Sequence, residues 1–468
     1  MVDVSTALEL ARWQFALTTL YHFTFVPLTL GLAPILALMQ TRWYRTRDDR
    51  WLRLTRFFAV LFVINFAIGA ATGIVQEFQF GMNWSGFSRY VGDVFGAPLA
   101  IEGIGAFMLE STFLGLWIFG RDLLSPRLHL ACLYVLWAGT WLSAYFIIAA
   151  NSWMQHPVGY TINHTTGRAQ ATDIWPILFQ RLTVVAYVHV ILAGLMTGGF
   201  VVLGVACWHL LRGTNIDLFA KAATLAIVVV LPVSVVQLAW GSELGVAITR
   251  VQPMKIAASE ALWNSAQPAP FSLFQIGGFS ASDPTPSFSI EIPGLLSFLA
   301  TNSFTAEVKG INQVNAAEQA QFGAGNYTPN VRLAYWSMRA MAYLGTLAML
   351  LAAWGGWLAH RRRLAGSRVF QRAAIAGIAL PFLANFGGWI LTETGRQPWI
   401  AYGLQQTATG VSSTSSTAMV ASSLAVFIAL YTLLAVIDFW LMGRYARCDP
   451  PELVVPATGE APLVAPQY

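Results

Sequence analysis

The sequence predicts an all-α, polytopic transmembrane bundle of about nine helices, with the N-terminus outside and the C-terminus in the cytoplasm. Three observations predict this fold class. Hydrophobic residues make up 56% of the 468 residues and charged residues only 10%, whereas a soluble chain carries roughly a quarter charged residues. Apolar runs of about 20 residues recur along the chain. Arginine and lysine gather in alternate connections between those runs.

The apolar runs divide the chain into four parts. Residues 1–240 hold six nearly contiguous spans, residues 241–335 form a polar loop, residues 336–447 hold three more spans, and residues 448–468 are expected to be a disordered tail. The nine predicted spans are Phe15–Met39, Phe57–Glu77, Ala97–Phe119, Leu128–Ala150, Leu182–Leu210, Leu218–Trp240, Trp336–Ala359, Ala373–Glu393 and Val420–Met442.

The basic residues predict the orientation. Of the 27 Lys and Arg residues, 17 lie in alternate connections, including the runs at 42–56 and 361–372. Connections rich in basic residues stay in the cytoplasm. The loop 241–335 is therefore predicted to be extracytoplasmic, and a loop of this length usually carries function.

Cysteine usage excludes several kinds of cofactor. The three cysteines are scattered, and no CxxC or CxxCH motif is present. This argues against iron–sulfur clusters, structural zinc and c-type haem. No internal repeat is evident either, which gives no support to an inverted-repeat transporter.

Polar residues inside the predicted spans are costly in lipid and mark candidate functional positions. They are His22, Glu77, Glu102, Glu110, His189, Arg339, Glu393 and Asp438. At 1.5 Å per residue, four possible iron ligands lie in the outer third of the membrane on four helices. These four are His22, His189, Met341 and Glu393.

Imidazole plus thioether is a ligand pair for a low-spin b-type haem, whereas a single histidine or carboxylate leaves the iron open to oxygen. His22 taken alone fits a hydrogen bond to a neighbouring helix equally well. Met341 taken alone would indicate core packing. Its interest comes from Arg339, two residues earlier, a cation that can pair with a haem propionate.

Two carboxylates on the third span, Glu102 and Glu110, are about 12 Å apart along a helix axis. Staggered carboxylates can pass protons where bulk water does not reach, and the alternative is a packing role with each carboxyl protonated. In the loop, Lys255 and Glu260 lie in a segment of helical spacing, 251–263. Taken without other information, this segment indicates a solvated charged helix. Glu77 and Asp438 lie near helix ends and are assigned no role.

Three motifs together resemble subunit I of the cytochrome bd quinol oxidases. They are QFALTTLYHFTFVPLTLG at 14–31, EFQFGMNWSGFSRYVGDVFGAPLAIEG at 77–103 and TETGRQPW at 392–399. The resemblance extends from Leu8 to about Arg447. The interval between Trp240 and Trp336 is shorter than in the long-loop branch, so the chain is similar to the short quinol-loop type.

The resemblance implies three haems near the outer face. His189 and Met341 match the axial ligands of the low-spin haem b (b558 type), with Arg339 as the neighbouring arginine. His22 and Glu393 match the ligands of the two high-spin haems, a haem b (b595 type) and a haem d. The motifs do not distinguish which of the two high-spin haems binds to His22. They also match both family members with haem d and members with only b-type haem.

The remaining site residues are also implied by the resemblance. Glu102 and Glu110 match the acids of the haem d environment and its proton supply, and Glu102 is a further candidate ligand of the haem d iron. Arg396 and Trp399, within TETGRQPW, are implied to contact a cofactor.

The family implies a membrane enzyme that oxidises quinol at the outer face and reduces dioxygen to water with cytoplasmic protons, generating a proton motive force without pumping. Lys255 and Glu260 fall on the lysine and the glutamate of the quinol-binding loop.

The implied partners are a second integral-membrane subunit (subunit II), small single-span subunits, menaquinol or ubiquinol, dioxygen and the lipid bilayer, and no nucleic acid. The implied location is the bacterial cytoplasmic (inner) membrane. Two rivals are a proton-coupled transporter, which membrane Glu and His residues also suit, and a non-catalytic scaffold subunit. Neither rival predicts stoichiometric haem, so a bound-haem assay separates all three.

Overall fold

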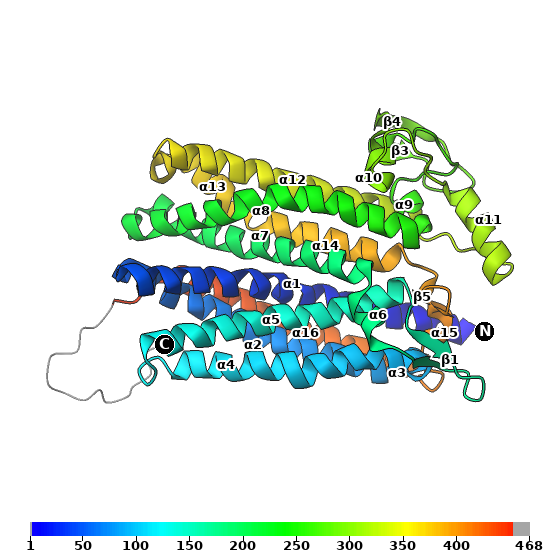
Figure 1. Cartoon of the computed structure of the whole chain (residues 1–468), viewed down its shortest axis with the longest axis horizontal. Coiled ribbons are helices and arrows are strands. Elements are labelled where there is room, and N and C mark those ends of the chain that lie inside the picture. The colour runs from blue at the N-terminus through cyan, green and yellow to red at the C-terminus, as the bar shows by residue number, and fades with distance from the viewer. Residues whose placement is uncertain (1, 453–468) are drawn as a thin grey trace.

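Long helices dominate the computed structural model, which describes residues 2–452, with side chains from residue 6 onward (Figure 1). Among these residues, nine helical segments are long and apolar enough to cross a membrane, and each contains one predicted span. The predicted all-α bundle of about nine membrane-spanning helices is thereby confirmed over the described residues. In chain order these segments are α1 (Val2–Thr46), α2 (Asp49–Gly81), α3–η1–α4 (Ser85–Ile101, Glu102–Phe107 and Met108–Phe119), α5 (Pro126–Gln155), α7 (Arg181–Arg212), α8 (Ile216–Val251), α12 (Val331–His360), α13–α14 (Arg368–Gly377 and Ala379–Thr394) and α16 (Thr417–Tyr445).

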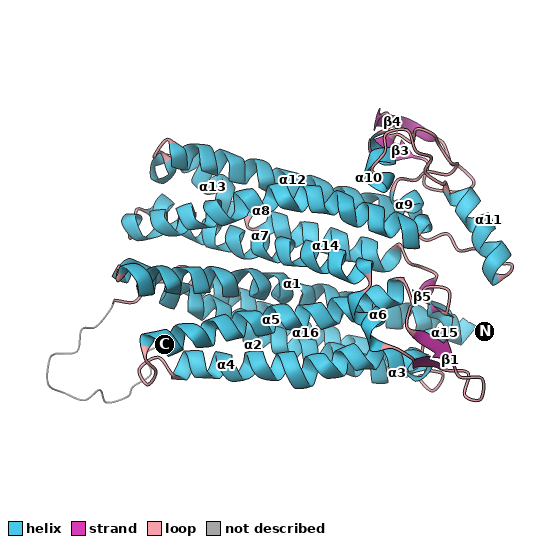
Figure 2. Cartoon of the chain, in the orientation of Figure 1, coloured by secondary structure: helices cyan, strands magenta, loops and turns pink. Residues whose placement is uncertain are grey.

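Short elements gather mainly at one end of the bundle, where Figure 2 shows the strands. The described residues form three antiparallel two-stranded sheets. The short elements are β1 (Tyr160–Ile162), β2 (Ala169–Ala171), α6 (Ile174–Phe179), α9 (Pro253–Ser259), β3 (Phe271–Gly277), β4 (Pro286–Ile292), α10 (Leu295–Thr301), α11 (Ile311–Phe322), η2 (Leu364–Gly366), β5 (Trp399–Ala401), β6 (Gln405–Gln406) and α15 (Thr407–Gly410).

Local sequence explains where the long helices begin and end. Ser125 caps α5 and is followed by Pro126 at the first helical position, where a missing N–H costs nothing. The Asn330 side chain accepts from the Leu333 N–H and starts α12. Gly213 ends α7 in the left-handed conformation (φ 74°) that favours glycine.

The long helices pack as two groups. One group comprises α7, α8, α12, α13 and α14; the other comprises α1, α2, α4 and α5, with α16 packed on α1 and α2. The two groups meet where α1 crosses α7. A Cβ atom added to Gly31 would lie 2.0 Å from the Gly194 carbonyl oxygen. Only glycine permits this close approach, a common way to join membrane helices.

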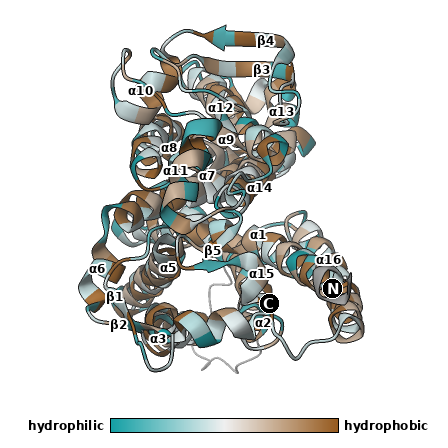
Figure 3. Ribbon diagram, turned by 90° about the vertical axis from the view of Figure 1, so that its right-hand side faces the viewer, coloured by the Kyte–Doolittle hydropathy of each residue, from teal (hydrophilic) through white to brown (hydrophobic). Residues whose placement is uncertain are grey.

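The apolar core lies in the half of the bundle away from the 252–330 segment. Its largest cluster includes Leu36, Phe58, Phe200 and Phe219, all fully buried. Figure 3 shows the hydropathy of the bundle seen along the helices. Of the polar candidates predicted from the sequence, His22, Glu77, Glu102, His189, Arg339 and Glu393 lie in the other half, nearer the 252–330 segment, which we call the loop end. Glu110 and Asp438 lie closer to the opposite end of their spans.

α1 begins at the loop end, and α16 ends at the opposite end of the bundle (Figure 1). This arrangement agrees with an odd number of spans. The connection that we predicted at 241–335 is shorter, 252–330, because α8 and α12 continue beyond the apolar runs. A helix satisfies its own backbone hydrogen bonds, so it need not stop where its side chains become polar.

The first residues of the predicted tail are held against the helix ends. Asn215 donates a 3.0 Å hydrogen bond to Asp449, and Arg53 donates to the Pro451 carbonyl at 3.2 Å. The rest of that predicted tail, 453–468, lies outside the described residues.

Candidate redox and quinol site

His22 is held in one tautomer by its neighbours on α2. Its Nδ1 atom lies 2.9 Å from the Thr72 hydroxyl, which itself donates to the Ile68 carbonyl at 2.9 Å. With the Thr72 hydroxyl donating to the Ile68 carbonyl, Nδ1 is assigned as the donor to Thr72, which leaves a free lone pair on Nε2. An imidazole oriented in this way is prepared to bind a metal through Nε2.

His189 has a ring nitrogen with no hydrogen-bond partner. Its Nε2 atom accepts from the Gln237 amide nitrogen of α8 at 3.2 Å, and its Nδ1 atom is buried without a partner. A buried polar atom normally finds a partner. In that arrangement Nδ1 carries the ring proton. With the oxygen and nitrogen of Gln237 exchanged, Nε2 donates to Gln237 and Nδ1 keeps the free lone pair that an iron would need. This unpaired nitrogen fits a histidine that binds an additional group, such as a haem iron.

Met341 lies on α12 in the same helix group as His189. Its thioether sulfur packs on α14 at Gly388, where an added Cβ atom would lie only 3.0 Å from the sulfur. The described residues contain no group of three or more His, Cys, Asp and Glu residues that could hold an ion together. Haem iron needs only one or two protein ligands, so the isolated His and Met positions suit haem.

Glu393 ends α14 between two donors. Asn151 of α5 donates to one carboxylate oxygen at 2.7 Å, and Arg396 donates to the other at 2.5 Å. Arg396 is itself buried, and it also donates to the Trp399 carbonyl at 3.3 Å. The structure thus brings together the three residues of the TETGRQPW motif that the sequence singled out.

The two carboxylates of the third span face one strip of α5. Ser143 donates to Glu102 at 2.5 Å, and Glu110 packs against Gly139, one helical turn away from Ser143. In a regular α-helix, eight residues would leave Glu102 and Glu110 about 80° apart around the axis. The π-helical segment η1 holds more residues per turn and reduces that offset. Sequence periodicity gave no sign of this segment.

Lys255 and Glu260 are buried, with exposed fractions of 2% and 6%. The interpretation of 251–263, taken alone, as a solvated charged helix was wrong. The segment packs beneath the rest of the loop, so its charges face protein groups. Lys255 donates to the side-chain oxygen of Gln155 and, at 3.0 Å, to the Thr392 carbonyl. Burial, helped by the Arg396 cation and opposed by Glu393, lowers the pKa of Lys255 to about 7.

Glu260 forms a buried, two-pronged ion pair with Arg339 of α12, at 3.1 and 2.7 Å. Arg339 also donates to the carbonyls of Ser259 and Ser272, and its guanidinium lies 3.8 Å from the centre of the Tyr335 ring. Burial raises the pKa of Glu260, and the Arg339 cation opposes that rise. The loop is therefore tied to α12 two residues before Met341.

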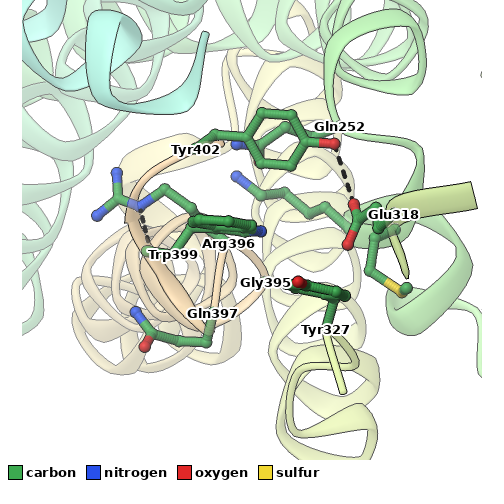
Figure 4. Close-up of a pocket in the computed structure, with 10 residues that line it drawn as sticks. Gln252, Glu318, Tyr327, Gly395, Arg396, Gln397, Trp399 and Tyr402 are labelled. Atoms are coloured by element: carbon green, nitrogen blue, oxygen red, sulfur yellow. Dashed lines mark hydrogen bonds between the residues drawn. The ribbon is translucent and has the colours of Figure 1, made fainter. Parts of the chain in front are cut away.

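A small pocket next to Lys255 contains residues that the sequence did not indicate. Tyr402 donates to Glu318 of α11 at 3.0 Å, and Figure 4 shows this hydrogen bond beside Arg396 and Trp399. About 10 Å³ is free to the centre of a water molecule, room for one water. Burial raises the pKa of both Glu318 and Tyr402. Irregular loop residues such as these leave no periodic signal in a sequence.

The residues that orient the candidate ligands were also missed. They are Thr72, Asn151, Ser143, Gln155 and Gln237. Each is a polar side chain in a mainly apolar helix, and that is the one signal that would have drawn attention to them.

Comparison with known proteins agrees with this geometry. The family model described as cytochrome bd terminal oxidase subunit I matches residues 10–450. Cytochrome bd ubiquinol oxidase subunit 1 of Bacillus subtilis (strain 168) is 42% identical, over 93% of each chain. Cytochrome bd-II ubiquinol oxidase subunit 1 of Escherichia coli (strain K12) is 34% identical, over 95% of this chain and 97% of that protein.

A solved structure has the same fold. The bd oxidase from Geobacillus thermodenitrificans superimposes with a TM-score of 0.86 at 28% identity, covering 94% of this chain and 98% of that chain. The resemblance inferred from the three motifs is thereby confirmed. The chain belongs to the cytochrome bd terminal oxidase subunit I family, and it is a subunit of a membrane-bound respiratory quinol oxidase that carries haem and works with a partner subunit.

Proposed function

We propose that this subunit oxidises quinol at the loop end of the bundle and reduces dioxygen to water with protons from the opposite end. The loop end is the extracytoplasmic side by the distribution of basic residues. Protons released outside and consumed from inside separate charge without a pump. The candidate ligands in the loop-end half, with Glu110 between them and the opposite end, support this proposal.

His189 and Met341 would hold the low-spin haem b (b558 type). His22 and Glu393 would hold the high-spin pair, a haem b (b595 type) and a haem d, with Glu102 as a further candidate ligand of the haem d iron. When bound, the haems supply electron transfer and the binding and reduction of dioxygen. The unpaired Nδ1 atom of His189 is the single observation that carries this assignment most directly.

The protein groups around these positions orient the candidate ligands and balance their charge. Thr72 fixes the tautomer of His22, and Asn151 fixes one oxygen of Glu393. Arg396, a buried cation beside Glu393, offsets its negative charge and leaves Nη1 free of a partner among the described residues. Arg396 and Trp399 would contact the cofactor on that side.

Lys255 and Glu260 would bind quinol and receive its protons. With a pKa of about 7, the Lys255 amine is present in both protonation states at neutral pH, so it can donate a hydrogen bond to a quinol oxygen. The raised pKa of Glu260 makes this carboxylate a better proton acceptor than an exposed one. Arg339 holds it in place.

Glu110 and Glu102 would pass protons from the cytoplasmic side toward the site of oxygen reduction. Both are buried and both face α5. Replacing each by glutamine removes the titrating proton but keeps the shape. We expect the rate of oxygen consumption to fall in both variants, and full activity in both would refute the proton path.

The proposed complex includes subunit II, small single-span subunits and either menaquinol or ubiquinol, in the cytoplasmic (inner) membrane of a bacterium. The test is quinol-driven oxygen consumption by the whole oxidase in liposomes with a pH probe on each side. We expect proton uptake from the cytoplasmic side to equal the number of electrons transferred. A larger uptake would indicate pumping, and none would refute the proposed sidedness.

A further inference from the structure

We propose that the β3–β4 hairpin of the loop inserts one face into the lipid leaflet at the loop end of the bundle. The hairpin would then form the lipid-side border of the quinol site. The first statement concerns only the fold and the membrane. The second rests on the proposed function.

One face of the hairpin is apolar and exposed. Phe274 and Ile276 of β3 stand opposite Ile290 and Phe288 of β4, and directly paired residues share a face. Their exposed fractions run from 38% for Phe274 to 55% for Ile276. Ile292 continues the row at 39%. None of these five side chains carries a polar atom.

The other face of β4 is polar. Ser287, Ser289 and Glu291 alternate with the apolar residues and are exposed. Strict alternation puts one residue type on each face of a strand. In water, exposing five adjacent apolar side chains would be unfavourable. An amphipathic strand of this kind fits a boundary between an apolar and a polar phase.

Contacts with α12 place the hairpin at membrane depth. Tyr343 donates to the Leu273 carbonyl, and the rings of Phe274 and Trp336 lie 5.6 Å apart. Tyr343 is 12 residues into α12, about 18 Å along its axis. The 30-residue helix is about 45 Å long. If a hydrocarbon layer of about 30 Å is centred on it, Tyr343 lies about 10 Å below the layer's edge.

The apolar face continues a lipid-facing surface. On α12, Trp336, Tyr343, Leu347 and Leu350 are 38–58% exposed along the flank of the bundle. Figure 1 shows the hairpin at the loop end of the bundle, and Figure 3 shows it at the edge of the molecule next to α12. The apolar hairpin face is thus continuous with the exposed apolar flank of α12. We therefore assign it to lipid.

The hairpin also contacts the proposed quinol site. The Ser272 carbonyl of β3 accepts a hydrogen bond from Arg339, the partner of Glu260. A quinol dissolved in the bilayer would thus meet the hairpin immediately before the buried Arg339–Glu260 pair.

Depth-dependent quenching tests the insertion in the whole oxidase reconstituted in liposomes. Cys132 and Cys207 are buried and Cys448 is exposed, so a Cys448→Ser background leaves no exposed cysteine among the described residues. A fluorescent label is attached at Phe288→Cys or, as the matched control on the opposite face, at Ser289→Cys. We expect nitroxide lipids to quench the label at 288 at least several-fold more than the label at 289, and iodide in water to do the reverse.

Two results would overturn the proposal. Equal quenching of both labels by iodide, with no quenching by lipid, would place the hairpin in water. Protection of the label at 288 from both quenchers would show that protein covers this face.

A kinetic readout tests the second statement separately. Ile290→Ser should raise the KM for a long-tailed quinol several-fold and leave the KM for a short-tailed, water-soluble quinol unchanged, with Ser289→Ala as the control. An unchanged KM for both substrates, with the quenching result intact, would refute the role in quinol entry but not the insertion. A third outcome is that Lys255→Met loses activity with both substrates while Ile290→Ser behaves like the wild type. That pair of results would support the quinol site at Lys255 and refute the hairpin as its lipid-side border.

Discussion

The buried ion pair between Glu260 and Arg339 gives a prediction whose size can be worked from the structure. The two side chains are 3% and 2% exposed, and two hydrogen bonds join them. Removing one partner of such a pair leaves an uncompensated buried charge, which costs about 3–5 kcal/mol. In Glu260→Gln, Arg339 keeps a neutral acceptor and its two backbone carbonyls. We therefore expect Glu260→Gln to lower the free energy of unfolding by about 3 kcal/mol, the lower end of that range.

The assay is denaturant unfolding of the oxidase in detergent, followed by tryptophan fluorescence, together with quinol oxidation. Glu291→Gln, an exposed carboxylate of the same loop, is the control and should change the free energy of unfolding by less than about 0.5 kcal/mol. Adding Arg339→Met to Glu260→Gln should recover part of the loss, because no charge is then left unpaired. If Glu260→Gln is as stable as Glu291→Gln, the pair does not tie the loop to α12.

Three further predictions follow from other contacts. Burial lowers the folded-state pKa of Lys255 to about 7, so above that pH the folded state binds fewer protons than the unfolded state. The free energy of unfolding of the wild type, relative to that of Lys255→Met, should therefore rise between pH 7 and about 10. A difference that does not change with pH in unfolding titrations would contradict this. Gly388→Ala should displace the sulfur of Met341, costing about 1–3 kcal/mol and shifting the low-spin haem absorption, whereas Gly345→Ala, with open space around it, should leave the spectrum unchanged. Ser143→Ala removes the 2.5 Å hydrogen bond to Glu102 and should slow oxygen consumption several-fold, with Ser143→Thr restoring the rate.

The helices were predictable because a membrane imposes a simple rule on sequence. A span must be apolar over about 20 residues, so each predicted span falls inside an observed helix. The helix ends were not predictable from hydropathy. The last turns of α8 carry Gly241, Ser242 and Glu243, yet the helix continues because its backbone hydrogen bonds do not depend on side-chain polarity.

The site was predictable only in part. Polar residues in apolar spans indicated the candidate ligands, because a polar side chain is costly in lipid and usually marks a functional position. The partners that orient them depend on how helices far apart in the chain pack, as Thr72 does for His22. The burial of Lys255 and Glu260 depends on how the loop folds over α12, and Glu318 meets Tyr402 only across that folded loop. Local sequence patterns do not encode contacts of this kind.

The most direct test of the account is a reduced-minus-oxidised absorption spectrum of the purified oxidase, with haem extraction, for the wild type and for His189→Ala. We predict b-type bands and a chlorin band in the wild type, and selective loss of the low-spin b band in His189→Ala. Bands of b type alone would refute the haem d assignment. A wild-type protein without haem, or a His189→Ala variant that keeps the low-spin band, would contradict the proposed haem site itself.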